Sequence, residues 1–160
     1  MKFPIFLSSL ALLATTNISL ALKPYQIRGV EDPIYHLYLQ ALPSSPSTAV
    51  MGPEASSEYF NISDTIQSTN TSMLLNIGDG GGGVSYLPLS FNATSGVGPW
   101  GLEGDTIITT EGSIYGRELN FLVCPNSVSG YYDLYLQTGS DTPSGETCSN
   151  YQTIHLPCLC

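Results

Sequence analysis

The stretch Phe60-Asn61-Ile62-Ser63-Asp64-Thr65-Ile66 alternates apolar and polar side chains and then turns at an Asp-Thr pair. Apolar residues at every second position place one face of an extended strand against a core. A second stretch, Trp100-Gly101-Leu102-Glu103-Gly104-Asp105-Thr106-Ile107, has the same aromatic start, Asp-Thr turn and final Ile, and Tyr25, Ile27 and Ile34 give a looser third copy. Copies that begin near residues 25, 60 and 100 have the length of a four-stranded β-trefoil unit, three of which close a barrel.

The rest of the chain is equally strand-like. No amphipathic helix is expected, because Gly, Pro or Ser/Thr clusters interrupt every apolar pattern of helical spacing. We expect strands within residues 25–30, 34–40, 59–66, 73–77, 84–91, 100–110, 119–123, 131–136 and 151–156, with turns at residues 43–46, 52–53, 78–83, 95–99 and 139–145. The pattern predicts one all-β domain over residues 22–160. A β-trefoil-like barrel is the first choice, and a Greek-key β-sandwich is the alternative.

The charge balance narrows the choice of partner. The 160 residues include 13 Asp and Glu but only 4 Lys and Arg, and the net charge is -9. A nucleic-acid site needs Lys and Arg clustered on one face, so we expect no nucleic-acid partner. An acidic surface also repels anionic lipid.

The first 21 residues predict secretion. Met1 and Lys2 precede an apolar run over residues 3–14, and Ser19-Leu20-Ala21 offers small residues at the two positions that signal peptidase requires. The alternatives are a membrane anchor or a buried helix, but the run is shorter than the roughly 20 residues that span a bilayer. We therefore expect residues 1–21 to be a secretory signal peptide. The mature protein is then expected in the extracellular space or the cell wall, with no membrane association.

Secretion would expose three sequence motifs to N-glycosylation. Asn61, Asn70 and Asn92 each begin an Asn-x-Ser/Thr motif without Pro in the middle. In a eukaryotic host they are candidate N-glycosylation sites.

All four cysteines lie late in the chain, at Cys124, Cys148, Cys158 and Cys160. In an oxidising compartment an even number predicts disulfides, and four cysteines allow three pairings. A zinc site is the rival, because Cys158-Leu159-Cys160 could chelate a metal. No second close Cys or His pair completes a tetrahedral set, so we expect no metal and no other cofactor.

The sequence contains few candidate catalytic residues. The glycine-rich residues 78–83 lack the Lys and the following helix of a phosphate loop and predict a hairpin loop instead. His36 and His155 lie in alternating stretches, and no Ser stands in a Gly-x-Ser-x-Gly elbow. Glu103 and Asp105 could act as the paired acids of a glycoside hydrolase, but Gly104-Asp105 has the character of a turn. We expect no enzyme, with a secreted glycoside hydrolase as the remote alternative.

Aromatic residues suggest binding instead. Trp100, together with Tyr131, Tyr132 and Tyr135, could form a platform for sugars, whose apolar faces stack on flat rings. Trp100 and Tyr131 are the candidate glycan-stacking residues. The alternative places these rings in the core.

The C-terminal half resembles a known family. Residues 120–135, NFLVCPNSVSGYYDLY, and residues 143–148, PSGETC, are similar to the PhiA-type cell-wall proteins of filamentous fungi, a family that includes secreted IgE-binding proteins. Residues 25–37, YQIRGVEDPIYHL, are similar to that family's first two strands. Residues 131–135 also resemble, more weakly, the C-terminal domain of Pir wall mannoproteins.

The resemblance implies a secreted, non-enzymatic cell-wall or surface glycoprotein of a fungus. It implies a Cys124–Cys148 disulfide, which leaves Cys158 and Cys160 bridged to each other or available to a partner chain. The chain departs from the family in lacking its N-terminal cysteines and in ending with Cys-x-Cys. A carbohydrate-binding or effector-like secreted β-domain is the alternative. The expected partner is a cell-wall polysaccharide or another secreted protein.

Overall fold

A computed structural model describes residues 23–94 and 100–157. The expected signal peptide, the turn at residues 95–99, and Cys158 and Cys160 lie outside the described residues. The described chain is all-β, as predicted, and its one helical element is the 3-10 turn η1, Glu54–Ser56. The strands are β1 Arg28–Gly29, β2 Tyr38–Leu42, β3 Ser45–Gly52, β4 Phe60–Ile62, β5 Ile66–Ser68, β6 Leu74–Ile77, β7 Tyr86–Asn92, β8 Trp100–Glu103, β9 Thr106–Thr109, β10 Phe121–Pro125, β11 Tyr132–Gln137, β12 Ser149–Gln152 and β13 Ile154–His155.

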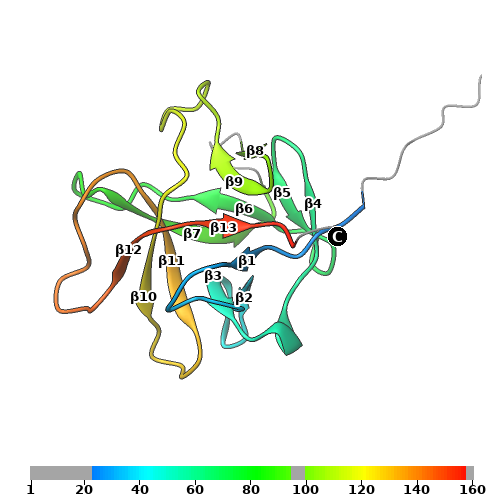
Figure 1. Cartoon of the computed structure of the whole chain (residues 1–160), viewed down its shortest axis with the longest axis horizontal. Helices are drawn as coiled ribbons and strands as arrows, with labels where there is room; N and C mark the ends of the chain where they lie inside the picture. Colours follow the sequence, from blue (N-terminus) through cyan, green and yellow to red (C-terminus); the bar gives the residue numbers. More distant parts are fainter. Residues whose placement is uncertain (1–22, 95–99, 158–160) are drawn as a thin grey trace, which may run out of the picture.

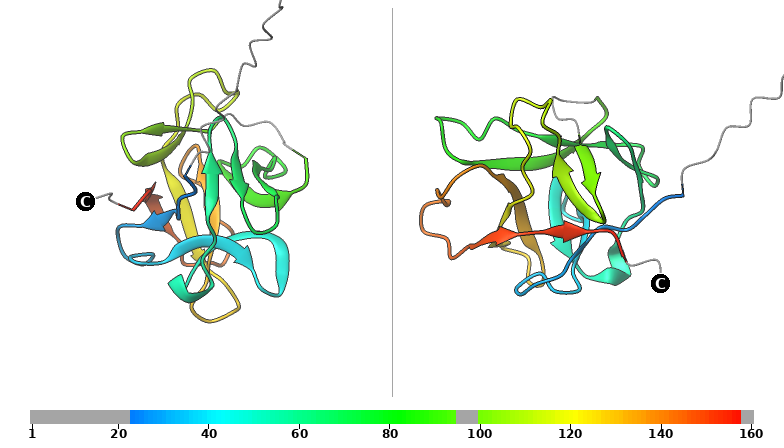
Figure 2. Two further views of the ribbon diagram at one scale, coloured as in Figure 1. Left: turned by 90° about the vertical axis from the view of Figure 1, so that its right-hand side faces the viewer. Right: turned by 45° about the horizontal axis from the view of Figure 1, so that its top comes forward.

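The strands form one curved antiparallel sheet in the order β4-β5-β6-β7-β11-β3-β2-β1-β13-β9-β8, and β10 pairs with both β11 and β12. The two ends of this path come together, because the Trp100 backbone N–H of β8 donates to the Asp64 carbonyl beside β4 at 3.0 Å. The result is a nearly closed, barrel-like sheet (Figures 1 and 2). Within the described ranges no helix has the length and apolar character needed to cross a membrane.

Both clear copies of the sequence repeat fold into hairpins. The first forms β4 and β5, the second forms β8 and β9, and the Asp-Thr pair lies in or beside each turn. Their aromatic residues, Phe60 and Trp100, are 0% and 2% exposed in the core. The looser third copy contributes only the two-residue β1 and no hairpin. The barrel agrees with the first-choice fold class, and the threefold trefoil symmetry stays a prediction.

The sequence pattern did not predict strand β3. β3 has eight residues, the most of any strand, although Pro46 near its start predicted a turn. Pro lacks a backbone N–H and so belongs at strand ends or bulges. Pro46 lies at such an end, where the register between β2 and β3 shifts after Ala41. The rest of β3 pairs with β2 on one side and with β7 and β11 on the other.

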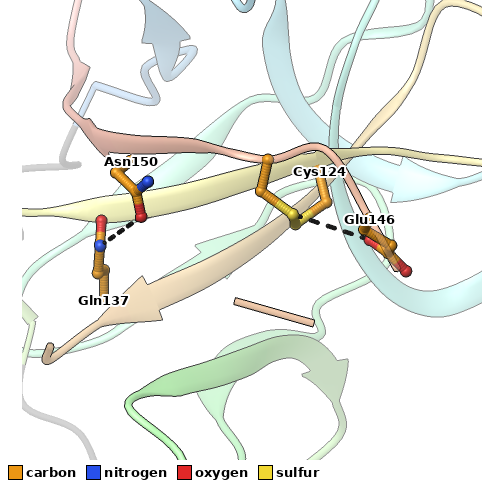
Figure 3. The surroundings of a disulfide bond; sticks show 5 residues. Cys124, Gln137, Glu146 and Asn150 are labelled. Carbon is orange, nitrogen blue, oxygen red and sulfur yellow. Dashed lines mark hydrogen bonds between the residues drawn. A yellow bond between two sulfur atoms is a disulfide. The ribbon is translucent and has the colours of Figure 1, made fainter. Parts of the chain in front are cut away.

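The expected bridge between Cys124 and Cys148 is present (Figure 3). It joins the end of β10 to the segment before β12, and the two Cα atoms lie 4.2 Å apart. Gln137 of β11 fastens the same region: its side-chain amide donates to Asn150 Oδ1 at 2.8 Å, and its carbonyl accepts from the Tyr151 N–H at 2.8 Å. The long connection between β11 and β12 is therefore held at both ends.

Candidate functional site

Two of the tyrosines that the sequence singled out, Tyr131 and Tyr135, lie directly before and within β11. Side chains alternate between the two faces of a strand, and Leu134 and Leu136 lie in the core. Asp133 and Tyr135, and Tyr131 directly before the strand, therefore point away from the core and are half-buried. The cross-strand neighbours of Asp133 and Tyr135 on that side include Leu122, Cys124 and Val50, which are fully buried. At about 3.3 Å per residue of extended chain, the Cα atoms of Tyr131 and Tyr135 are about 13 Å apart. Asp133 lies midway between them in the sequence. We call the half-buried surface formed by Tyr131, Asp133 and Tyr135, with Tyr86, Pro88 and Glu146 beside them, the β11 face.

Tyr135 forms the aromatic centre of the β11 face. It lies opposite Pro88 of β7, an exposed residue. Its ring meets the ring of Tyr86 edge to face, with centroids 5.5 Å apart. Burial, then the charges of Asp133 and Glu146 and finally Tyr86, raise the pKa of Tyr135 to about 12. At neutral pH the phenol is therefore an O–H donor, and its ring offers a flat apolar surface.

Two carboxylates flank this ring. Asp133 Oδ1 accepts from the Asn126 side-chain amide at 2.7 Å, which orients the carboxylate. Glu146 Oε2 lies 3.9 Å from Cys148 Sγ (Figure 3). The disulfide ties the acidic loop, residues 138–148 with Asp141 and Glu146, to Cys124 of β10. Among the described residues neither carboxylate pairs with Lys, Arg or His. Their negative charges are therefore not neutralised by the protein itself.

Tyr131 lies at the other end of the β11 face from Tyr135. Its hydroxyl lies 3.4 Å from Ser56 Oγ of η1. Its ring packs on Gly52 of β3, where an added Cβ would lie 2.5 Å from the Tyr131 ring and 2.8 Å from Gln40 Nε2. Gln40 is fully buried; its amide N–H groups bind the Tyr38 and Pro53 carbonyls, while its Oε1 has no hydrogen-bond partner in the described structure.

The prediction that Trp100 stacks on glycans is wrong. The side chain is 2% exposed, and Nε1 donates to the Leu75 carbonyl at 3.0 Å, so the indole is a satisfied core residue. The β8–β9 hairpin also lies at the opposite end of the molecule from the turn between β10 and β11 (Figure 1). Tyr132 packs against the core, on the other side of β11 from Tyr131 and Tyr135. The platform thus contains two of the four rings considered.

Glu103 and Asp105 have separate partners. Glu103 ends β8 and forms an ion pair with Arg117, whose Nε lies 2.6 Å from Glu103 Oε2. Asp105 lies in the turn, as its sequence suggested, and its Oδ1 is 3.3 Å from His155 Nδ1. His155 Nε2 contacts Thr153 Oγ1 at 2.8 Å. These contacts fix the acids locally and do not align them as a facing pair.

The remaining predicted residues are distributed over the surface. His36 is exposed beside the Tyr35 ring. Asn70 and Asn92 are exposed, and Asn61 is half-buried on β4. Cys124, Cys148 and Glu146 bring potential ligand atoms within 4.8 Å of one another, but both sulfurs are used in the disulfide and offer no thiolate to a metal.

Sequence reasoning missed Tyr86, Pro88, Glu146 and Gln40. The first two reach Tyr135 only through the pairing of β7 with β11, which no local pattern specifies. The strict alternation of residues 131–135 was the available signal, and it separates Tyr132 from its neighbours.

No protein-family model matches the chain, and no curated protein or solved structure shows significant similarity to it.

Proposed function

We propose that this chain is a secreted, non-enzymatic glycoprotein of a fungal wall or surface, and that its β11 face holds a wall polysaccharide. The observation that supports binding is the placement of Tyr131, Asp133 and Tyr135 on one side of β11 and of the residue before it, away from the core and partly exposed. Sugar rings have apolar faces that stack on tyrosine and hydroxyls that donate to carboxylates. Two rings separated by a carboxylate suit an extended chain of sugars better than a single sugar.

The surroundings of the β11 face favour a preformed site. Tyr131 is held by Gly52 and η1, Asp133 by Asn126, and the acidic loop by the disulfide. Ligand binding then orders few additional side chains, which lowers its entropic cost. The sequons, the N-terminal apolar run and the disulfide support the secreted location, since disulfides persist in oxidising compartments.

Co-sedimentation with insoluble β-glucan and chitin tests this function. The wild-type mature protein is expected in the pellet, with no sugar released into the supernatant. Tyr131→Ala and Tyr135→Ala are expected to shift the protein to the supernatant. Tyr35→Ala removes an exposed ring, 56% accessible, from another loop and serves as the matched control.

Each other outcome has a definite meaning. Release of sugar would overturn the non-enzymatic assignment and direct attention to Glu103 and Asp105. Absence from every pellet would overturn polysaccharide binding and favour another secreted protein as the partner.

A further inference from the structure

The β11 face is rich in hydrogen-bond acceptors and in negative charge. Asp133 and Glu146 are both close enough to Tyr135 for their charges to raise its pKa, and no described cation pairs with either carboxylate. Tyrosine ring faces are electron-rich as well. All of these groups favour a ligand that brings donors and positive charge.

We propose that the β11 face selects a cationic amino-sugar polymer, such as deacetylated chitin, over neutral wall polysaccharides. This inference rests on the proposed function. A protonated sugar amine donates charge-assisted hydrogen bonds to Asp133 or Glu146. The same ammonium group is attracted to the faces of the adjacent tyrosine rings. An acetylated amine is neutral and gains neither interaction.

The charge of the whole chain acts in the same direction. With a net charge of -9, the protein attracts a polycation at long range and repels a polyanion. A basic peptide shares the charge but lacks flat apolar sugar faces. The backbone spacing between Tyr131 and Tyr135, about 13 Å between Cα atoms at about 3.3 Å per residue, favours a chain of stacking units. A bare metal ion is a poorer fit, because no group of three Cys, His or acidic ligands within the described residues includes Asp133.

The test uses soluble hexasaccharides of glucosamine, N-acetylglucosamine and β-1,3-linked glucose, titrated calorimetrically into the mature protein at a pH where the amines are protonated. We expect the glucosamine oligomer to bind about 10-fold more tightly than the other two, since each of two partly exposed charge pairs contributes up to a few-fold. The advantage should shrink as salt screens the charges.

The decisive variant is Asp133→Asn with Glu146→Gln, which removes both charges and keeps the shape of each side chain. The Asp133→Asn change retains a side-chain oxygen that can accept from Asn126, so the local fold is maintained. This double variant should lose the preference for glucosamine and still bind the neutral oligomers. Glu31→Gln with Glu111→Gln changes the net charge equally at two exposed positions on other loops, and it should keep most of the preference.

Three outcomes would overturn the inference in different ways. Equal binding of all three oligomers, lost in Tyr135→Ala, would refute the cationic preference and leave the proposed function intact. Failure to bind any oligomer, together with failure to co-sediment, would refute both. Equally tight, competing binding of oligolysine with the same dependence on Asp133 and Glu146 would show a general site for basic polymers, including peptides.

Discussion

Removal of the disulfide provides a quantitative test of how the acidic loop is held. Cys124→Ala with Cys148→Ala breaks a bridge between residues 24 positions apart. A closed loop of that size lowers the entropy of the unfolded chain by an amount worth about 3.5 kcal/mol at 25 °C. Cys124 is fully buried in β10, and alanine avoids the unsatisfied hydroxyl that serine would introduce there.

The free energy of unfolding should therefore fall by about 3.5 kcal/mol, measured by urea denaturation of the wild type and the double variant. For a domain of this size the midpoint of thermal unfolding should fall by about 10 °C. A loss below about 1 kcal/mol would contradict this expectation. It would mean that the segment between Cys124 and Cys148, 24 positions apart, keeps structure in the unfolded state, or that the bridge is absent in solution. Unreduced peptide mapping of the wild type separates these two explanations.

Three further predictions concern single side chains. Tyr135 should ionise near pH 12, so ultraviolet titration should show one late-ionising phenol in the wild type that is missing from Tyr135→Phe. Since the pKa of Tyr135 is raised above the ordinary value of 10.0, the free energy of unfolding should fall as the pH rises from about 10 to about 12. Trp100→Phe should destabilise the fold by about 1–3 kcal/mol in urea, because it leaves the Leu75 carbonyl unsatisfied, and should leave sugar binding unchanged. Gly52→Ala should cost about 1–3 kcal/mol in the same assay and weaken pelleting with polysaccharide, because the new methyl displaces the Tyr131 ring; unaltered pelleting would show that Tyr131 does not contact the ligand.

Local patterns predicted a large part of the fold. The Asp-Thr pairs correctly marked the turns of two hairpins, because alternation and a turn signal lie within a few residues of each other there. β3 was not predicted, because Pro46 is a strong local turn signal, while the strand depends on pairing with β2, β7 and β11. Strand pairing between distant segments is not encoded in any short window.

The candidate site also combines features that a short stretch of sequence predicts with features that depend on contacts between distant segments. Alternation within residues 131–135 distinguishes outward Tyr131 and Tyr135 from inward Tyr132. The residues next to Trp100 do not decide between a sugar platform and the core, and closure of the sheet buries its side chain. Glu146 joins the site only because the disulfide folds its loop back onto β10.

Binding of polysaccharide at the β11 face can be observed residue by residue in a nuclear magnetic resonance titration of labelled mature protein with a soluble wall oligosaccharide. We expect the signals of four residues to shift together and saturate: Tyr86, Tyr131, Asp133 and Tyr135. Shifts confined to the exposed rings elsewhere, such as Tyr35 at 56% and Tyr59 at 50% exposure, would contradict it.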